Sequence, residues 1–66
     1  MMGLKINGDE RQVASSTIET LLGELKISLA GVAVELNGEI VRKENYGTAS
    51  LREGDVLEIV TLVGGG

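Results

Sequence analysis

The chain has 66 residues, carries 10 Asp and Glu against 6 Lys and Arg for a net charge of −4, and contains no His, Cys, Pro, Trp or Phe. This length predicts one small domain, because the fraction of surface that folding buries falls with chain size. Leu, Val and Ile together number 21. These aliphatic side chains must supply the whole core, since no disulfide and no Cys or His zinc site can form.

Charge and hydropathy also limit the partners. The few basic residues are scattered, which predicts no nucleic-acid binding and favours a basic partner surface. Every apolar run is far shorter than the roughly 20 residues that span a bilayer, and the first residues lack a signal-peptide pattern. We therefore expect a cytoplasmic protein with no membrane and no nucleic acid among its partners.

The first elements indicate a β-hairpin. From Met2 to Asn7, apolar and polar residues alternate with the period of two that is typical of a half-buried strand. The dipeptide Asn7-Gly8 follows, and this pair favours a tight hairpin turn with positive φ at both residues. We expect a second short strand to contain Val13.

A helix is predicted next. The spacing from Ser16 to Glu19 fits a capping box, in which Ser16 would be the N-cap and Glu19 would reach back to its backbone. Four apolar residues then follow at helical spacing and form one stripe about two turns long. They are Ile18, Leu21, Leu22 and Leu25.

The second half of the chain reads as strands. Residues 32–36 alternate apolar and polar or small side chains, Asn37-Gly38 marks a turn, and Ile40-Val41 indicates a short returning strand. Residues 51–55 predict another turn. The stretch 56–63 is rich in β-branched residues and predicts the last strand. Strands surrounding one helix give an α+β fold in which the helix covers one face of a small sheet of four to five strands.

The predicted last strand carries more apolar residues than one covered face needs. Val56, Val60 and Leu62 fall on the side opposite Leu57 and Ile59. Because only one face of the sheet has a helix to pack on, we interpret the first three residues as a candidate docking patch for a partner. An isolated exposed valine on a small sheet is, however, ordinary.

The composition predicts a protein that is not an enzyme. It has no His, its carboxylates show no pairing signature, and it lacks a glycine-rich phosphate-binding motif. Neither a thiolate and imidazole set nor a Ca²⁺-loop spacing is present, so we expect no metal site and no bound cofactor.

The most informative feature is the end of the chain, Val63-Gly64-Gly65-Gly66. Three terminal glycines arise by chance roughly once in a few thousand chains at average glycine usage. Without Cβ atoms, Gly64 and Gly65 suit a narrow tunnel in a partner enzyme, and the α-carboxylate of Gly66 is an anion that can attack an electrophile such as the α-phosphate of ATP. The alternative is a flexible stub without function.

The reach of this segment constrains the partner. Four residues at about 3.3 to 3.6 Å each extend only some 13 to 14 Å beyond the last strand. A partner that acts on Gly66 must therefore also contact the folded body. We divide the chain accordingly into a domain of residues 1–63 and a flexible tail of residues 64–66.

Over essentially its whole length the chain resembles the ThiS sulfur carrier proteins of thiamine biosynthesis, which are small ubiquitin-like β-grasp domains. The resemblance rests on Asn37-Gly38, Ile40-Val41-Arg42 with Tyr46, Leu51 with Gly54-Asp55, Leu57-Glu58-Ile59-Val60, and Val63-Gly64-Gly65-Gly66. It implies a mixed β-grasp sheet in which the first and last strands are parallel neighbours.

The resemblance also implies a chemistry and its partners. A ThiF-type enzyme would use ATP to adenylate Gly66, and sulfur supplied by a cysteine desulfurase would then convert the carboxylate to a thiocarboxylate. The thiazole synthase ThiG would accept the sulfur. The chain would be a co-substrate with no catalytic residue of its own.

Three alternatives stay open. MoaD, the small subunit of molybdopterin synthase, shares the implied fold, tail and activation chemistry. A ubiquitin-like protein modifier would form an isopeptide bond through the same glycine. A plain interaction domain would never be activated, and deleting Gly65 and Gly66 would leave its function unchanged.

Overall fold

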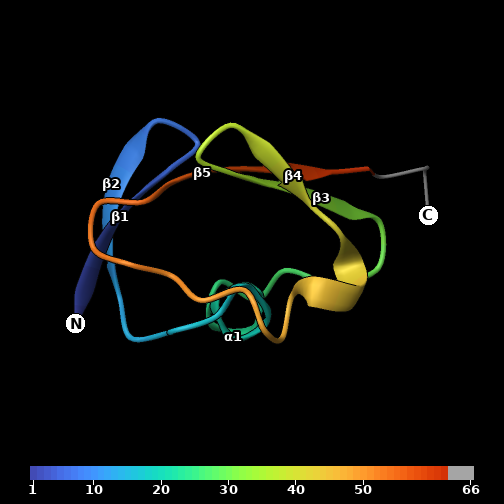
Figure 1. Cartoon of the computed structure of the whole chain (residues 1–66), viewed down its shortest axis with the longest axis horizontal. Coiled ribbons are helices and arrows are strands. Elements are labelled where there is room, and N and C mark those ends of the chain that lie inside the picture. Colours follow the sequence, from blue (N-terminus) through green and yellow to red (C-terminus); the bar gives the residue numbers. More distant parts are fainter. Residues whose placement is uncertain (63–66) are drawn as a thin grey trace.

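The computed structural model of the chain describes residues 1–62, which form a five-stranded sheet with one α-helix against one face (Figure 1). The strand order is β2-β1-β5-β3-β4. The elements are β1 (Met2–Ile6), β2 (Asp9–Val13), α1 (Ile18–Glu24), β3 (Val32–Leu36), β4 (Glu39–Val41), the short 3₁₀ helix η1 (Lys43–Asn45) and β5 (Val56–Thr61). The predicted α+β fold is confirmed.

Both predicted Asn-Gly turns are present. The φ angles are 51° at Asn7 and 88° at Gly8, and 52° at Asn37 and 86° at Gly38. These left-handed values are the ones that a two-residue hairpin turn of this type requires, and Asn and Gly tolerate them best. Each turn therefore joins two antiparallel strands in a fixed register. Leu4 and Ile6 of the first hairpin and Val34 and Leu36 of the second then face the core.

The helix begins one residue later than the predicted capping box. Thr17, not Ser16, is the N-cap: its hydroxyl accepts a hydrogen bond from the Thr20 N–H at 3.2 Å, and the Thr20 hydroxyl accepts one from the Thr17 N–H at 3.1 Å. The Ser16 carbonyl accepts a hydrogen bond from the Leu51 N–H, and Thr17 forms a β-bridge with Ser50. This pairing holds the chain extended through Thr17, so the helix cannot start earlier and Glu19 has no capping role.

Strand β5 lies in the middle of the sheet. It pairs in parallel with β1 at Lys5–Val56 and Ile6–Leu57, and antiparallel with β3 over five residue pairs. The parallel pairing of first and last strands is the arrangement that the β-grasp resemblance implied. The strand ends at Thr61, so Leu62 lies outside it, although the sequence predicted a strand to Val63, which lies outside the described residues.

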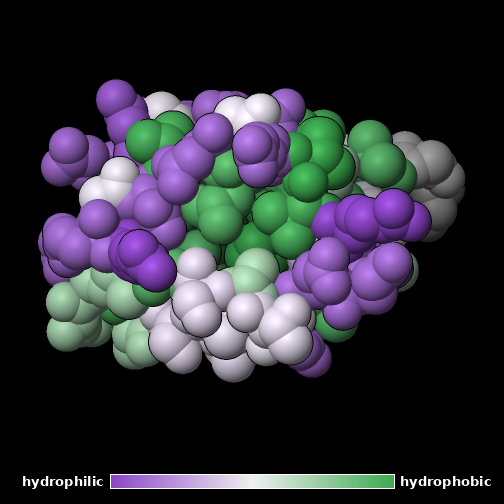
Figure 2. All heavy atoms as spheres, viewed as in Figure 1, coloured by the Kyte–Doolittle hydropathy of each residue, from purple (hydrophilic) through white to green (hydrophobic). Residues whose placement is uncertain are grey.

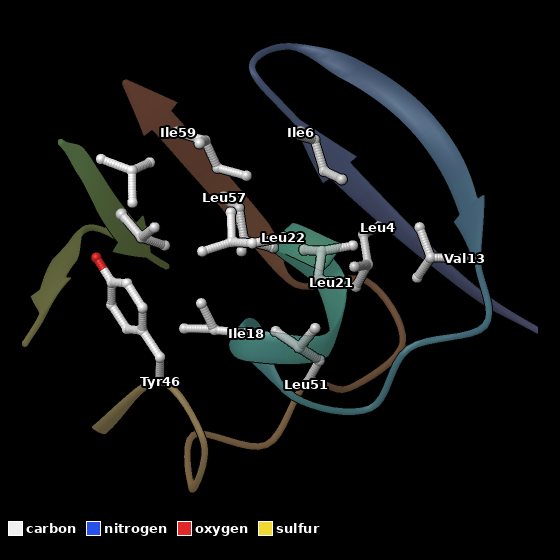
Figure 3. Packing of buried hydrophobic residues seen from close by; sticks show 12 residues of the cluster. Leu4, Ile6, Val13, Ile18, Leu21, Leu22, Tyr46, Leu51, Leu57 and Ile59 are labelled. Atoms are coloured by element: carbon white, nitrogen blue, oxygen red, sulfur yellow. The ribbon is translucent and has the colours of Figure 1, made fainter. Parts of the chain in front are cut away.

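The core fills the space between the sheet and α1 (Figure 3). Ile18, Leu21 and Leu22 of the helix stripe are fully buried and meet Leu57 of β5, and Leu25 is partly buried. Tyr46, which follows η1, closes one end of the cluster. The remaining buried members are Leu4, Ile6, Val13, Val32, Val34, Leu51 and Ile59. In residues 1–62 no helix is long and apolar enough to cross a membrane.

Candidate functional site

Strand β5 separates a buried face from an exposed one. Leu57 and Ile59 point toward α1 and are buried, whereas Val56, Val60 and Leu62 are 42%, 53% and 60% exposed. Figure 1 shows α1 on one side of the sheet, and within residues 1–62 no helix covers the other side. The structure therefore places the predicted docking patch on a free sheet face, and its role as a docking surface remains a prediction.

The exposed face extends across β3 and β4. Ala33 stands opposite Val60, and Ile40, which is 66% exposed, stands opposite Glu35. Figure 2 shows hydrophobic surface in the sheet half of the molecule, bordered by hydrophilic residues. We call the outward side chains of Ala33, Glu35, Ile40, Val56, Glu58 and Val60, together with Leu62, the open face.

Sequence reasoning missed Ile40 as a member of this face. The signal was nevertheless present, because a two-residue turn at Asn37-Gly38 fixes the register and so opposes Ile40 to Glu35. Because residues directly opposite each other share a face, Ile40 then belongs with Glu35, away from the buried Val34.

Two asparagine side chains hold β5 from its two sides. The Asn7 side chain pairs with the main chain of Ile59, with the Ile59 N–H donating to Oδ1 at 2.7 Å and Nδ2 donating to the Ile59 carbonyl at 3.0 Å. On the other side, Asn37 Oδ1 accepts from the Val56 N–H at 2.9 Å, and its Nδ2 donates to Asp55 at 3.0 Å. The two hairpin turns thus hold β5 at its first residue and at its middle.

The three terminal glycines lie outside the described residues. Gly66 as the reacting residue, Gly64 and Gly65 as a threaded segment, and the predicted flexibility of residues 64–66 therefore stay predictions. The last described residue is Leu62, whose N–H donates to the Gly31 carbonyl. Gly31 has a φ of 70°, and a Cβ there would lie 3.2 Å from the Leu62 carbonyl oxygen, so this close approach requires glycine.

The charged groups of residues 1–62 include one carboxylate with a shifted pKa and no metal-binding cluster. Within residues 1–62 no group of three Asp or Glu side chains is placed to hold a metal ion. One carboxylate is perturbed: hydrogen bonds from the Ser15 hydroxyl at 2.6 Å and from the Ala14 N–H at 3.2 Å hold the pKa of Glu24 below its ordinary value. Glu24 ends the helix, on the opposite side of the sheet from the open face, so its contacts join α1 to the segment after β2.

Comparison with protein families finds one that spans nearly the whole chain, since residues 4–66 match the ThiS family. The sulfur carrier protein ThiS of Thermus thermophilus is 39% identical over 61 residues, which cover 92% of this chain and 95% of that protein. The sulfur carrier protein ThiS of Bacillus subtilis is 40% identical over 65 residues, covering 96% and 98%.

A second kind of relative is much longer. A thiazole synthase of Paramagnetospirillum magneticum is 53% identical in an alignment 66 residues long, which covers 98% of this chain and 20% of that protein. The chain thus spans about a fifth of that relative.

The fold comparison agrees with the sequence comparison. A crystal structure of the thiamine biosynthesis protein ThiS from Geobacter metallireducens superposes with a TM-score of 0.83 at 35% identity, over 98% of this chain and all of that one. Its NMR solution structure gives a TM-score of 0.80. The chain belongs to the ThiS family, the sulfur carrier proteins of thiamine biosynthesis.

Proposed function

We propose that the chain carries sulfur as a thiocarboxylate at Gly66. A carboxylate oxygen attacks the α-phosphorus of ATP on a ThiF-type enzyme, which releases pyrophosphate and leaves an acyl adenylate. A sulfur nucleophile, derived from cysteine through a desulfurase, then displaces AMP. The net result replaces one oxygen of the carboxylate by one sulfur.

The family match carries this proposal. Proteins named sulfur carriers align with the chain over nearly their full length, and the alignment to the family runs through the terminal glycines. The lack of His and Cys is compatible with a co-substrate, because the adenylating enzyme supplies the catalytic groups and the ATP.

The long relatives support thiazole synthase as the acceptor of the sulfur. In two proteins named thiazole synthase, a stretch similar to this chain makes up about a fifth of the length. Joining a carrier to an enzyme in one polypeptide raises their effective concentration, which is useful when the two must meet in each cycle. We infer that this chain likewise passes its sulfur to a ThiG-type enzyme.

Docking on the body is part of the proposal. The reach of residues 63–66 is about 13 to 14 Å, so an enzyme that acts on Gly66 must lie against the domain close to Leu62. The open face supplies exposed apolar side chains on β5 itself, at Val56 and Val60. We propose that both the adenylating enzyme and the thiazole synthase use this end of the molecule.

The test is intact-protein mass spectrometry after incubation with ATP, Mg²⁺, a ThiF-type enzyme, a cysteine desulfurase and cysteine. We expect a mass increase equal to the replacement of one oxygen by one sulfur, located in the C-terminal peptide. Gly66→Ala should fold normally and gain less sulfur, because a methyl group enters the channel of the partner.

The controls separate the alternatives. A reference carrier confirms that the enzyme mixture is active, and a chain lacking Gly65 and Gly66 should gain no sulfur. If the intact chain stays unmodified in an active mixture, the proposal fails. If the thiocarboxylate forms but supports molybdopterin synthesis and not thiazole synthesis, the acceptor is wrong and the carrier chemistry stands.

A further inference from the structure

A pair of carboxylates lies at the centre of the open face. Glu58 of β5 stands directly opposite Glu35 of β3, and Ile40 of β4 stands opposite Glu35 in the same row. Residues paired in this way lie about 4.5 to 5.5 Å apart at Cβ, with their side chains on the same face. Two negative charges therefore share a site framed by apolar side chains.

The pair has no compensating partner in the described part of the chain. Among residues 1–62 the one ion pair joins Arg42 and Glu44, and neither the carboxylate of Glu35 nor that of Glu58 accepts a hydrogen bond there. Lys5 is the cation of the neighbouring strand β1, but it stands opposite Val56 and forms no ion pair with Glu58.

The facing carboxylates of Glu35 and Glu58 destabilise the isolated domain. Like charges directly opposite each other on neighbouring strands destabilise a sheet, whereas Thr or Gln at either position would not. The surrounding side chains Ile40, Val56 and Val60 are exposed and apolar, so they offer the carboxylates no hydrogen-bond donor. The arrangement becomes favourable when a cation is placed between the two carboxylates and its apolar surroundings are covered.

We propose that the adenylating enzyme docks on the open face and places a basic side chain, best an arginine, against both Glu35 and Glu58. A guanidinium has five donors in a planar fork and can serve two carboxylates at once. Apolar side chains of the enzyme cover Ile40, Val56 and Val60 around this contact and exclude water from it, which strengthens the charge-assisted hydrogen bonds. The net charge of −4 favours the same basic partner.

This inference rests on the proposed function and is tested on the same reaction. The probe is a ThiF-type adenylating enzyme with ATP and Mg²⁺, and pyrophosphate release is measured against the concentration of the carrier. Glu35→Gln and Glu58→Gln keep size and shape and remove one charge each. We expect each variant to raise KM about tenfold, the effect of one lost charge-assisted hydrogen bond, with kcat little changed.

Glu39→Gln is the matched control. Glu39 is also exposed on the sheet, but it stands opposite Leu36, which packs against the core, and so belongs to the other face. The control should keep the wild-type KM. Raising the salt concentration should increase the KM for the wild-type carrier more than the KM for Glu58→Gln. Salt screens a charge–charge contact that the variant has already lost.

A stability measurement excludes a merely structural role. Glu35→Gln and Glu58→Gln should unfold at the same or a higher denaturant concentration than the wild type, since they relieve repulsion. If the enzyme releases no pyrophosphate with the wild-type carrier, the proposed function fails. If the wild-type carrier is adenylated but Glu35→Gln and Glu58→Gln have the same KM as Glu39→Gln, the carboxylate pair is no docking site. The same conclusion follows if Glu35→Gln and Glu58→Gln lose stability together with activity.

Discussion

The side chain of Asn7 takes the place of a strand residue beside Ile59. Its amide forms both hydrogen bonds that a neighbouring main chain would form, at 2.7 and 3.0 Å. This matters because the regular pairing of β1 with β5 stops at Ile6–Leu57, just before the chain turns away into the hairpin. One side chain therefore extends the support of β5 by two residues toward its end.

Replacing Asn7 should weaken the domain measurably. Asn7→Gly keeps the positive φ but leaves the Ile59 N–H without its partner, and we expect a loss of about 1 to 3 kcal/mol in the free energy of unfolding. Asn7→Ala should lose about 1 kcal/mol more, because a Cβ disfavours the left-handed conformation. Denaturant titration measures both losses, and amide exchange should accelerate at Ile59. Wild-type stability of Asn7→Gly would show that water replaces the amide without cost.

Truncating a side chain should affect stability on the buried face of β5 and adenylation on its exposed face. Leu57→Ala removes a fully buried side chain and should cost about 2 to 5 kcal/mol. Val60→Ala should leave the free energy of unfolding within about 0.5 kcal/mol of the wild type, because Val60 is half exposed. The same Val60→Ala variant should be a poorer substrate for adenylation. Equal activity of Val60→Ala and wild type would remove Val60 from the docking surface.

The helix cap gives a direct comparison between neighbouring residues. Thr17→Ala removes the hydroxyl that accepts from the Thr20 N–H, and we expect it to cost about 1 kcal/mol. Ser16→Ala should have a much smaller effect, because the structural role of Ser16 is carried by its main-chain carbonyl. Thermal unfolding of the two variants distinguishes them. A larger loss of stability for Ser16→Ala than for Thr17→Ala would show that Ser16 is the N-cap.

The Glu24 carboxylate should make stability depend on acid pH. Because its folded-state pKa lies below the ordinary value of 4.5, folding favours the ionised form. Its contribution is complete above that ordinary value and disappears as the pH falls through the lowered pKa. Glu24→Gln should therefore be less stable than the wild type at pH 7, and the difference should vanish in strong acid. Equal stability of Glu24→Gln and the wild type at pH 7 would show that the contacts with Ala14 and Ser15 do not stabilise the folded chain.

Local patterns predicted most of the elements. Alternation identified β1 and β3, the β-branched residues identified β5, and the two Asn-Gly pairs identified both hairpins, because these signals arise from residues that are close together in the chain. The predicted capping box at Ser16 was wrong because the start of the helix depends on residues far away in the chain. Ser16 and Thr17 are both good N-cap residues, and the choice between them is made by Leu51 and Ser50, more than 30 positions away.

In the candidate site, too, local signals were predictable from the sequence and contacts between distant residues were not. The exposure of Val56, Val60 and Leu62 followed from alternation within one strand. The Glu35–Glu58 pair required the register between β3 and β5, which joins residues 23 positions apart and has no local signal. Asn7 was recognised only as a turn residue, since its contact with Ile59 depends on the parallel pairing of the first and last strands.

The central position of β5 also dictates when the domain can be completed. The hairpins β1–β2 and β3–β4 have no strand pairing with each other and join only through β5. Translation reaches β5 last among the elements, so a ribosome must have released almost the whole domain before its two halves can combine. An unfinished chain cannot form the sheet. Because Val56, Glu58 and Val60 of the open face belong to β5, the docking that we propose would require a chain in which this strand has already been made.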